Sequence, residues 1–248
     1  MSNIVSENFL QCVIDQGVYS TLRNLRQYLK YMLDGVPLRD KRMLDVGGGC
    51  GLLTLWGAIH GANAICLEPD ADGATSGMAI QFEKLKSSLG VDIPATFYTD
   101  TLQEFLQTTE YRGCYDVIMM SDSINHLDEK SCIELLNNSG ARNKYLGLLS
   151  HVFESMSPGG YIVVTDCSRS NFFNDLGWRS PIINTIEWEK HQSPFFWDKL
   201  FQQVGFHPAR IKWSSPNALG YLGRVFLGNR LTAYFTFSHF RLLIRKPL

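Results

Sequence analysis

Three alternating glycines follow an acidic residue in the segment LDVGGGCG, at positions 44–51. A run of apolar residues leads into Asp45, and a second apolar run follows Gly47, Gly49 and Gly51. Glycine lets the backbone adopt positive φ and approach a ligand closely. In open α/β sheets, ligands bind beyond the carboxyl ends of the strands. The segment therefore predicts a strand, a ligand-binding turn and a helix, with the acid beside the ligand.

The spacing of these glycines distinguishes between nucleotide cofactors. The dinucleotide fingerprint GxGxxG has its third glycine three residues after the second, and Leu52 occupies that position here. A P-loop requires GK[ST], which is absent after this turn. The GxGxG spacing therefore argues against NAD and against a nucleoside triphosphate. Asp45 could alternatively serve only to cap the glycine turn.

A second acid, Glu68, ends the next apolar run, at 64–68. A carboxylate in this position can accept hydrogen bonds from both hydroxyls of a ribose. Glu68 therefore supports a ligand that contains adenosine. It does not separate one adenosine cofactor from another, because NAD-binding folds also end this strand with an acid.

Short apolar runs alternate with helical stretches along most of the chain. We expect strands at 43–46, 64–68, 95–98, 115–120 and 161–166, and helices at 52–60, 75–89 and 144–156. This alternation predicts a parallel sheet with helices on both faces. An amphipathic helix is expected at 19–33, a turn at 158–160, a helix at 195–204, and strands at 209–213 and 234–245.

The order of these motifs resembles the class I S-adenosylmethionine-dependent methyltransferases. LDVGGGCG resembles their motif I, and YDVIMMSDSINHL and SPGGYIVV resemble later segments of the core, so the resemblance covers roughly residues 40–170. It implies a Rossmann-like α/β fold with a seven-stranded, mostly parallel sheet, an N-terminal helical cap and an insert before the sixth strand. We expect one domain over 1–248, with the cap at 1–40, the cofactor-binding core at 41–170, and an acceptor-side insert with the C-terminal strands at 171–248.

The same resemblance implies S-adenosylmethionine as the methyl donor, with S-adenosylhomocysteine as the product. It assigns cofactor contacts to the turn and to the ends of the strands, at Asp45, Gly47, Gly49, Gly51, Glu68, Asp100 and Ser121. Asp100 would lie near the adenine amino group. It could alternatively cap a helix that begins near Leu102.

Two histidines are candidates for a general base, which methyl transfer to a hydroxyl requires near neutral pH. His126 follows the fourth expected strand, where it could instead support packing of the next helix. His191 lies in the aromatic insert at 167–197, which would cover an acceptor. Its segment, IEWEKHQ, could alternatively be one solvated helix face.

We expect O-methylation of a small-molecule or glycan-linked hydroxyl. The glycan comes from a resemblance of LEPDADGATSG, DCSRSNFF and IEWEKHQSP to bacterial methyltransferase-domain proteins associated with surface-glycan genes. Alternatives are N-methylation of a small amine and a non-catalytic homologue that acts as a partner subunit. A nucleic-acid acceptor is not expected, because SDSI replaces the [ND]PP[YF] motif and the chain is not basic overall.

Charge is distributed unevenly along a chain whose net charge is -1. No acidic residue follows Asp198, whereas Lys and Arg continue to the end. This basic segment could bind an anionic acceptor, contact a membrane surface peripherally through residues 214–233, or pack against the acidic remainder. The absence of a secretory signal, together with six scattered cysteines, indicates the cytoplasm and predicts no metal site.

Overall fold

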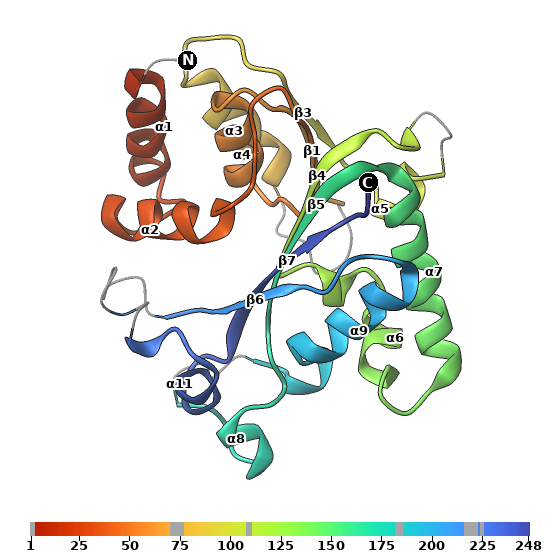
Figure 1. Cartoon of the computed structure of the whole chain (residues 1–248). Coiled ribbons are helices and arrows are strands. Elements are labelled where there is room, and N and C mark those ends of the chain that lie inside the picture. The colour runs from red at the N-terminus through yellow and green to blue at the C-terminus, as the bar shows by residue number, and fades with distance from the viewer. Residues whose placement is uncertain (1–2, 70–76, 108–110, 182–185, 216–222, 224–225) are drawn as a thin grey trace.

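The computed structural model describes residues 3–69, 77–107, 111–181, 186–215, 223 and 226–248. A seven-stranded sheet in the order β3-β2-β1-β4-β5-β7-β6 runs through the molecule (Figure 1). All neighbouring strands are parallel except β7, which is antiparallel to both β5 and β6. The predicted Rossmann-like, mostly parallel sheet is confirmed. The strands are β1 (Arg42–Val46), β2 (Asn63–Leu67), β3 (Ala95–Tyr98), β4 (Tyr115–Ser121), β5 (Met156–Cys167), β6 (Arg210–Trp213) and β7 (His239–Arg245).

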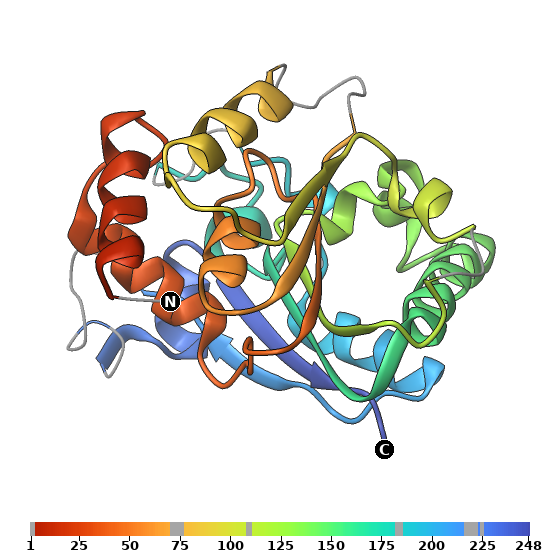
Figure 2. The same ribbon diagram turned by 90° about the horizontal axis from the view of Figure 1, so that it is seen from above.

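Helices cover both faces of the sheet (Figures 1 and 2). One face carries α1 (Asn3–Asp15), α2 (Leu22–Leu33), α3 (Leu52–Ile59) and α4 (Met78–Ser87). The other carries α5 (Leu102–Phe105), α6 (Glu129–Glu134), α7 (Ser139–Ser155) and α9 (Pro194–Val204). Short elements complete the chain: the 3-10 helices η2 (Ile124–His126) and η3 (Trp188–Lys190), with α8 (Phe172–Asp175) and α11 (Arg230–Phe235).

The central strands are apolar on both sides because each face is covered by helices. In β4, Val117 and Met119 belong to the core beneath α1 to α4, whereas Ile118 and Met120 belong to the core beneath α6, α7 and α9. All four side chains are fully buried. This double burial anchors the strand whose carboxyl end carries Ser121.

The C-terminal strand is shorter than its sequence predicts. Residues 234–245 were expected as one strand, but Tyr234 and Phe235 belong to α11, and β7 begins only at His239. The Asn229 side chain caps this helix by accepting a hydrogen bond from the Thr232 amide at 3.0 Å. Ser238, at a φ of 51°, then redirects the chain. The prediction was wrong there because Tyr234 and Phe235 are aromatic residues that favour a strand locally, whereas the cap at Asn229 starts a helix that includes them.

One further segment departs from expectation, and another is only partly described. The predicted turn at 158–160 lies inside β5, which begins at Met156 and pairs irregularly with β4 between Tyr115 and Val117. Residues 216–222, 224 and 225 of the segment 214–233, for which membrane contact was predicted, lie outside the described residues, and the membrane contact stays a prediction. In the described part of the chain, no helix has the length and apolar character needed to cross a membrane.

Candidate functional site

The glycine turn between β1 and α3 has the left-handed backbone that its sequence predicts. Gly47, Gly49 and Gly51 have φ values of 69°, 55° and 76°. A Cβ atom on Gly47 would lie 2.5 Å from the Ser123 Cβ, and one on Gly51 would lie 2.2 Å from the Phe82 ring. A Cβ on Gly49 would meet nothing closer than 3.8 Å. Gly49 is therefore open to a ligand, whereas the other two glycines permit close packing of the turn.

Asp45 lies beneath this turn as a fully buried carboxylate. Its Oδ2 accepts a hydrogen bond from the Thr54 hydroxyl at 2.7 Å, and its Oδ1 has no partner in the described part of the protein. Burial, reinforced by repulsion from Glu68, raises the pKa of Asp45 to about 6. Because an unpaired buried oxygen is unfavourable, this arrangement suits a carboxylate that binds a cationic group of a ligand.

Glu68 follows β2 directly and is tied to the same turn. Its Oε2 accepts a hydrogen bond from the Gly49 amide at 2.9 Å. The amides of Gly47 and Gly48 bond to the Leu67 carbonyl at 2.8 and 3.1 Å, which joins the turn to the end of β2. Glu68, the predicted partner of the ribose, therefore adjoins the open glycine.

Asp100 and Ser121 lie at the carboxyl ends of β3 and β4. Asp100 is exposed, and α5 is capped by Thr101, whose hydroxyl accepts from the Glu104 amide at 3.2 Å. The alternative that Asp100 caps this helix is therefore wrong, and its contact with adenine stays a prediction. The Ser121 hydroxyl lies 3.2 Å from that of Tyr28 in α2, so the N-terminal cap reaches this edge of the sheet.

His126 ends η2 and points toward the surface. Its side chain is 57% exposed, and its Nδ1 lies 3.1 Å from Glu129 in the first turn of α6. In the described part of the chain, Glu129 is the ion-pair partner of His126. The contact agrees with the alternative that this histidine supports the following helix.

His191 is held by a carboxylate at the carboxyl end of β5. Its Nδ1 lies 2.7 Å from Oδ1 of Asp166, which is 1% exposed and also accepts from the Cys167 amide at 2.7 Å. Burial raises the pKa of Asp166, although the hydrogen bond from His191 opposes this shift. A carboxylate at Nδ1 leaves Nε2 as the proton acceptor. The segment is not one solvated helix face, since Trp188 is buried.

A second histidine–carboxylate pair was missed by the sequence interpretation. His239 begins β7, and its Nε2 lies 2.8 Å from Oδ1 of Asp122, which follows β4 at a φ of 54°. Burial disfavours a charged imidazole, but Asp122 raises the pKa of His239 overall. Although partial desolvation opposes this shift, the charge on His239 lowers the pKa of Asp122, whose side chain is exposed. The pair forms because β7 runs antiparallel and so begins where β4 and β5 end.

Comparisons with known proteins agree with this geometry. A family model described as a methyltransferase domain matches residues 19–210. The ubiquinone biosynthesis O-methyltransferase of Marinobacter nauticus is 25% identical over 173 residues. That match covers 67% of this chain and 63% of the relative, so the chain spans less than two thirds of that enzyme.

Solved structures share the fold at low sequence identity. An S-adenosylmethionine-dependent methyltransferase from Mesorhizobium loti has a TM-score of 0.59 and 14% identity, with 90% of this chain and 100% of that chain covered. One from Archaeoglobus fulgidus has a TM-score of 0.53 and 17% identity, with 90% and 91% covered. The family model spans most of the chain, including the glycine turn. The chain therefore belongs to the methyltransferase domain family.

Proposed function

We propose that the protein methylates a hydroxyl group of a small-molecule or glycan-linked acceptor. The observation that carries this proposal is the His191–Asp166 pair at the carboxyl end of β5. A neutral hydroxyl must lose its proton to become a good nucleophile, whereas an unprotonated amine or a thiolate needs no base. The name of the Marinobacter nauticus relative, an O-methyltransferase, also supports a hydroxyl acceptor.

The residues at the glycine turn fit S-adenosylmethionine. The unpartnered Oδ1 of Asp45 would bind the ammonium group, Glu68 would bind the ribose, and the space over Gly49 would admit the ligand. When bound, S-adenosylmethionine supplies an electrophilic methyl group on a positively charged sulfur. The protein supplies orientation, because alignment of the reacting groups accounts for much of the acceleration of such a reaction.

His191 would act as the general base. Its Nε2 accepts the hydroxyl proton, and the ionised form of Asp166 stabilises the imidazolium that results. The imidazole is 17% exposed, so an acceptor can reach it without much bulk water entering. His126 is a poor candidate by comparison, because it is mostly solvated and pairs with Glu129.

The test is transfer of a labelled methyl group to a panel of hydroxyl and amine acceptors, with His191→Gln beside the wild type. We expect hydroxyl acceptors to be methylated and kcat to fall about 100-fold or more in the variant, the usual contribution of a general base. His126→Gln is the matched control and should stay within about twofold. Methylation of amines alone would establish the N-methyltransferase alternative. An unchanged kcat in His191→Gln would remove the base from the mechanism.

A further inference from the structure

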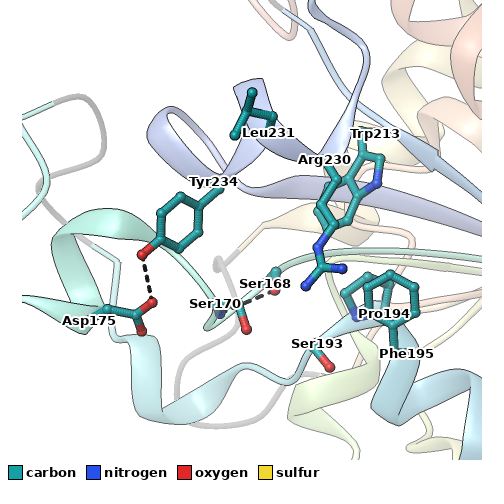
Figure 3. A pocket seen from close by; sticks show the side chains of 10 residues that line it. All are labelled: Ser168, Ser170, Asp175, Ser193, Pro194, Phe195, Trp213, Arg230, Leu231 and Tyr234. Atoms are coloured by element: carbon teal, nitrogen blue, oxygen red, sulfur yellow. Dashed lines mark hydrogen bonds between the residues drawn. The ribbon is translucent and has the colours of Figure 1, made fainter.

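A cavity of about 520 Å³ opens past the carboxyl end of β5, where Ser168 and Ser170 line it (Figure 3). Its walls come from the segment after β5, the start of α9, the end of β6, and α11. Ser168 lies two residues beyond Asp166, and Ser193 lies two residues beyond His191. The cavity and the proposed base therefore share two stretches of chain.

Among the described residues that line the cavity, one side chain is cationic. Arg230 lines the wall, and no ion pair joins it to a carboxylate of the described residues. Its guanidinium instead lies 5.0 Å from the centre of the Phe195 ring. Stacking on a ring leaves the N–H groups at the edge of the guanidinium free for a carboxylate or phosphate.

The acidic residue of the cavity lies away from this arginine. Asp175 accepts a hydrogen bond from the Tyr234 hydroxyl at 2.9 Å, and Figure 3 shows this pair at the opposite end of the cavity from Arg230. Asp175 therefore forms no ion pair with the Arg230 guanidinium. A ligand with one anionic group would orient that group toward Arg230.

Apolar rings form the wall around the guanidinium. Trp213 and Phe195 lie beside Arg230, Pro194 lies next to Phe195, and Leu231 also lines the cavity. Flat apolar walls favour a ring that can stack on them. Hydroxyl groups of Ser168, Ser170 and Ser193 lie across the cavity and can bond to polar substituents of such a ring.

We infer that this cavity binds the remote part of the acceptor, and that the acceptor is a ring bearing an anionic group that Arg230 neutralises. This inference rests on the proposed function, since it treats the neighbouring His191 as the base. The shared chemistry, a ring with a carboxylate, occurs both in aromatic acids and in sugar acids. The test therefore includes one probe of each kind.

The experiment follows the indole N–H signals in NMR spectra of the ¹⁵N-labelled protein during titration with benzoate and with glucuronate. Benzyl alcohol and glucose serve as the neutral counterparts. Trp213→Phe identifies the signal of Trp213 at the cavity, and Trp197, fully buried in the core, provides an internal reference. We expect at least one anion to shift the Trp213 signal saturably, while the Trp197 signal stays in place.

Arg230→Gln should weaken binding of the anion about tenfold or more, because it removes a charge-assisted hydrogen bond. Arg210→Gln is the matched control: it neutralises an exposed arginine on β6 that does not line the cavity, and affinity should change less than about twofold. A preference for benzoate would identify an aromatic acid, and a preference for glucuronate a sugar acid.

Three results would overturn the inference: no shift of Trp213 with either anion, equal binding of the neutral counterparts, or unchanged affinity in Arg230→Gln. Displacement of the anion by saturating S-adenosylhomocysteine would also overturn it, because acceptor and cofactor must bind together. The Gly49 amide reports cofactor binding in the same spectra. Failure of the acceptor cavity is therefore distinguishable from failure of the methyltransferase site.

Discussion

Replacing Asp45 with asparagine removes a charge beneath the glycine turn while keeping the shape of the side chain. The carboxylate is fully buried, with Oδ2 bonded to Thr54 and Oδ1 unpartnered among the described residues. Asparagine can still accept the Thr54 hydrogen bond through its carbonyl oxygen. The substitution therefore tests whether the buried negative charge is present to bind a cation.

The pKa of Asp45 fixes the size of the effect on stability. Burial raises this pKa from 3.8 to about 6, and one pKa unit corresponds to about 1.4 kcal/mol. A raised pKa favours the folded state at low pH, and this contribution is lost as pH rises through about 6. Between about pH 4 and pH 7, the free energy of unfolding of the wild type should therefore fall by about 2 kcal/mol relative to Asp45→Asn.

Calorimetry with S-adenosylhomocysteine measures the effect on binding. At about pH 7 the variant should bind about 10- to 100-fold more weakly, the effect of losing a charge-assisted hydrogen bond to the ligand ammonium. At about pH 5 the gap should shrink, because Asp45 of the wild type is then largely protonated. Asp116→Asn, whose carboxylate accepts from the Arg42 amide at 2.9 Å near the opposite end of β4, is the control. Equal affinities at pH 7, or a wild-type affinity independent of pH, would refute the reasoning.

Two further predictions concern the turn and the second histidine. Gly51→Ala should lower the free energy of unfolding by about 2 kcal/mol or more, because the new side chain meets both a φ of 76° and a clash with Phe82. Urea titration measures this change in stability. A variant as stable as the wild type would contradict the prediction. Gly49→Val should abolish binding of S-adenosylhomocysteine, because its side chain fills the space left open to the ligand. The loss of stability should be smaller than in Gly51→Ala, because the φ of 55° opposes the substitution without an added clash. Retained affinity in calorimetry would remove Gly49 from the cofactor site. His239→Asn should destabilise the protein most at mildly acidic pH. Because the pKa of His239 is raised, the stability that its charged form contributes is lost as pH rises through that pKa. Because the pKa of Asp122 is lowered, the stability that its ionised form contributes is lost only at strongly acid pH. Urea titrations at about pH 6 and pH 9 check this, and a difference from the wild type that does not shrink at the higher pH would refute it.

The sequence predicted the sheet and the glycine turn well because their signals are local. The glycine spacing at 47–51, the acid at 68 and the apolar runs before them are read within a few residues of one another. The prediction for 234–245 was wrong for a related reason. Aromatic residues there favour a strand locally, whereas the cap at Asn229 starts a helix that includes the first of them, and Ser238 redirects the chain before the strand begins.

The amino-acid sequence by itself therefore determined the fold class and the approximate position of the glycine turn, and it predicted S-adenosylmethionine as the methyl donor. Only the tertiary structure decided which histidines acquire carboxylate partners. His191 and Asp166 are 25 positions apart, and His239 and Asp122 are 117 apart. Neither separation has a local signature, because Asp166 and Asp122 lie at the carboxyl ends of β5 and β4, whereas their histidines come from later elements: His191 follows η3, and His239 begins β7. The antiparallel direction of β7 brings His239 to those strand ends, and no spacing along the chain encodes it.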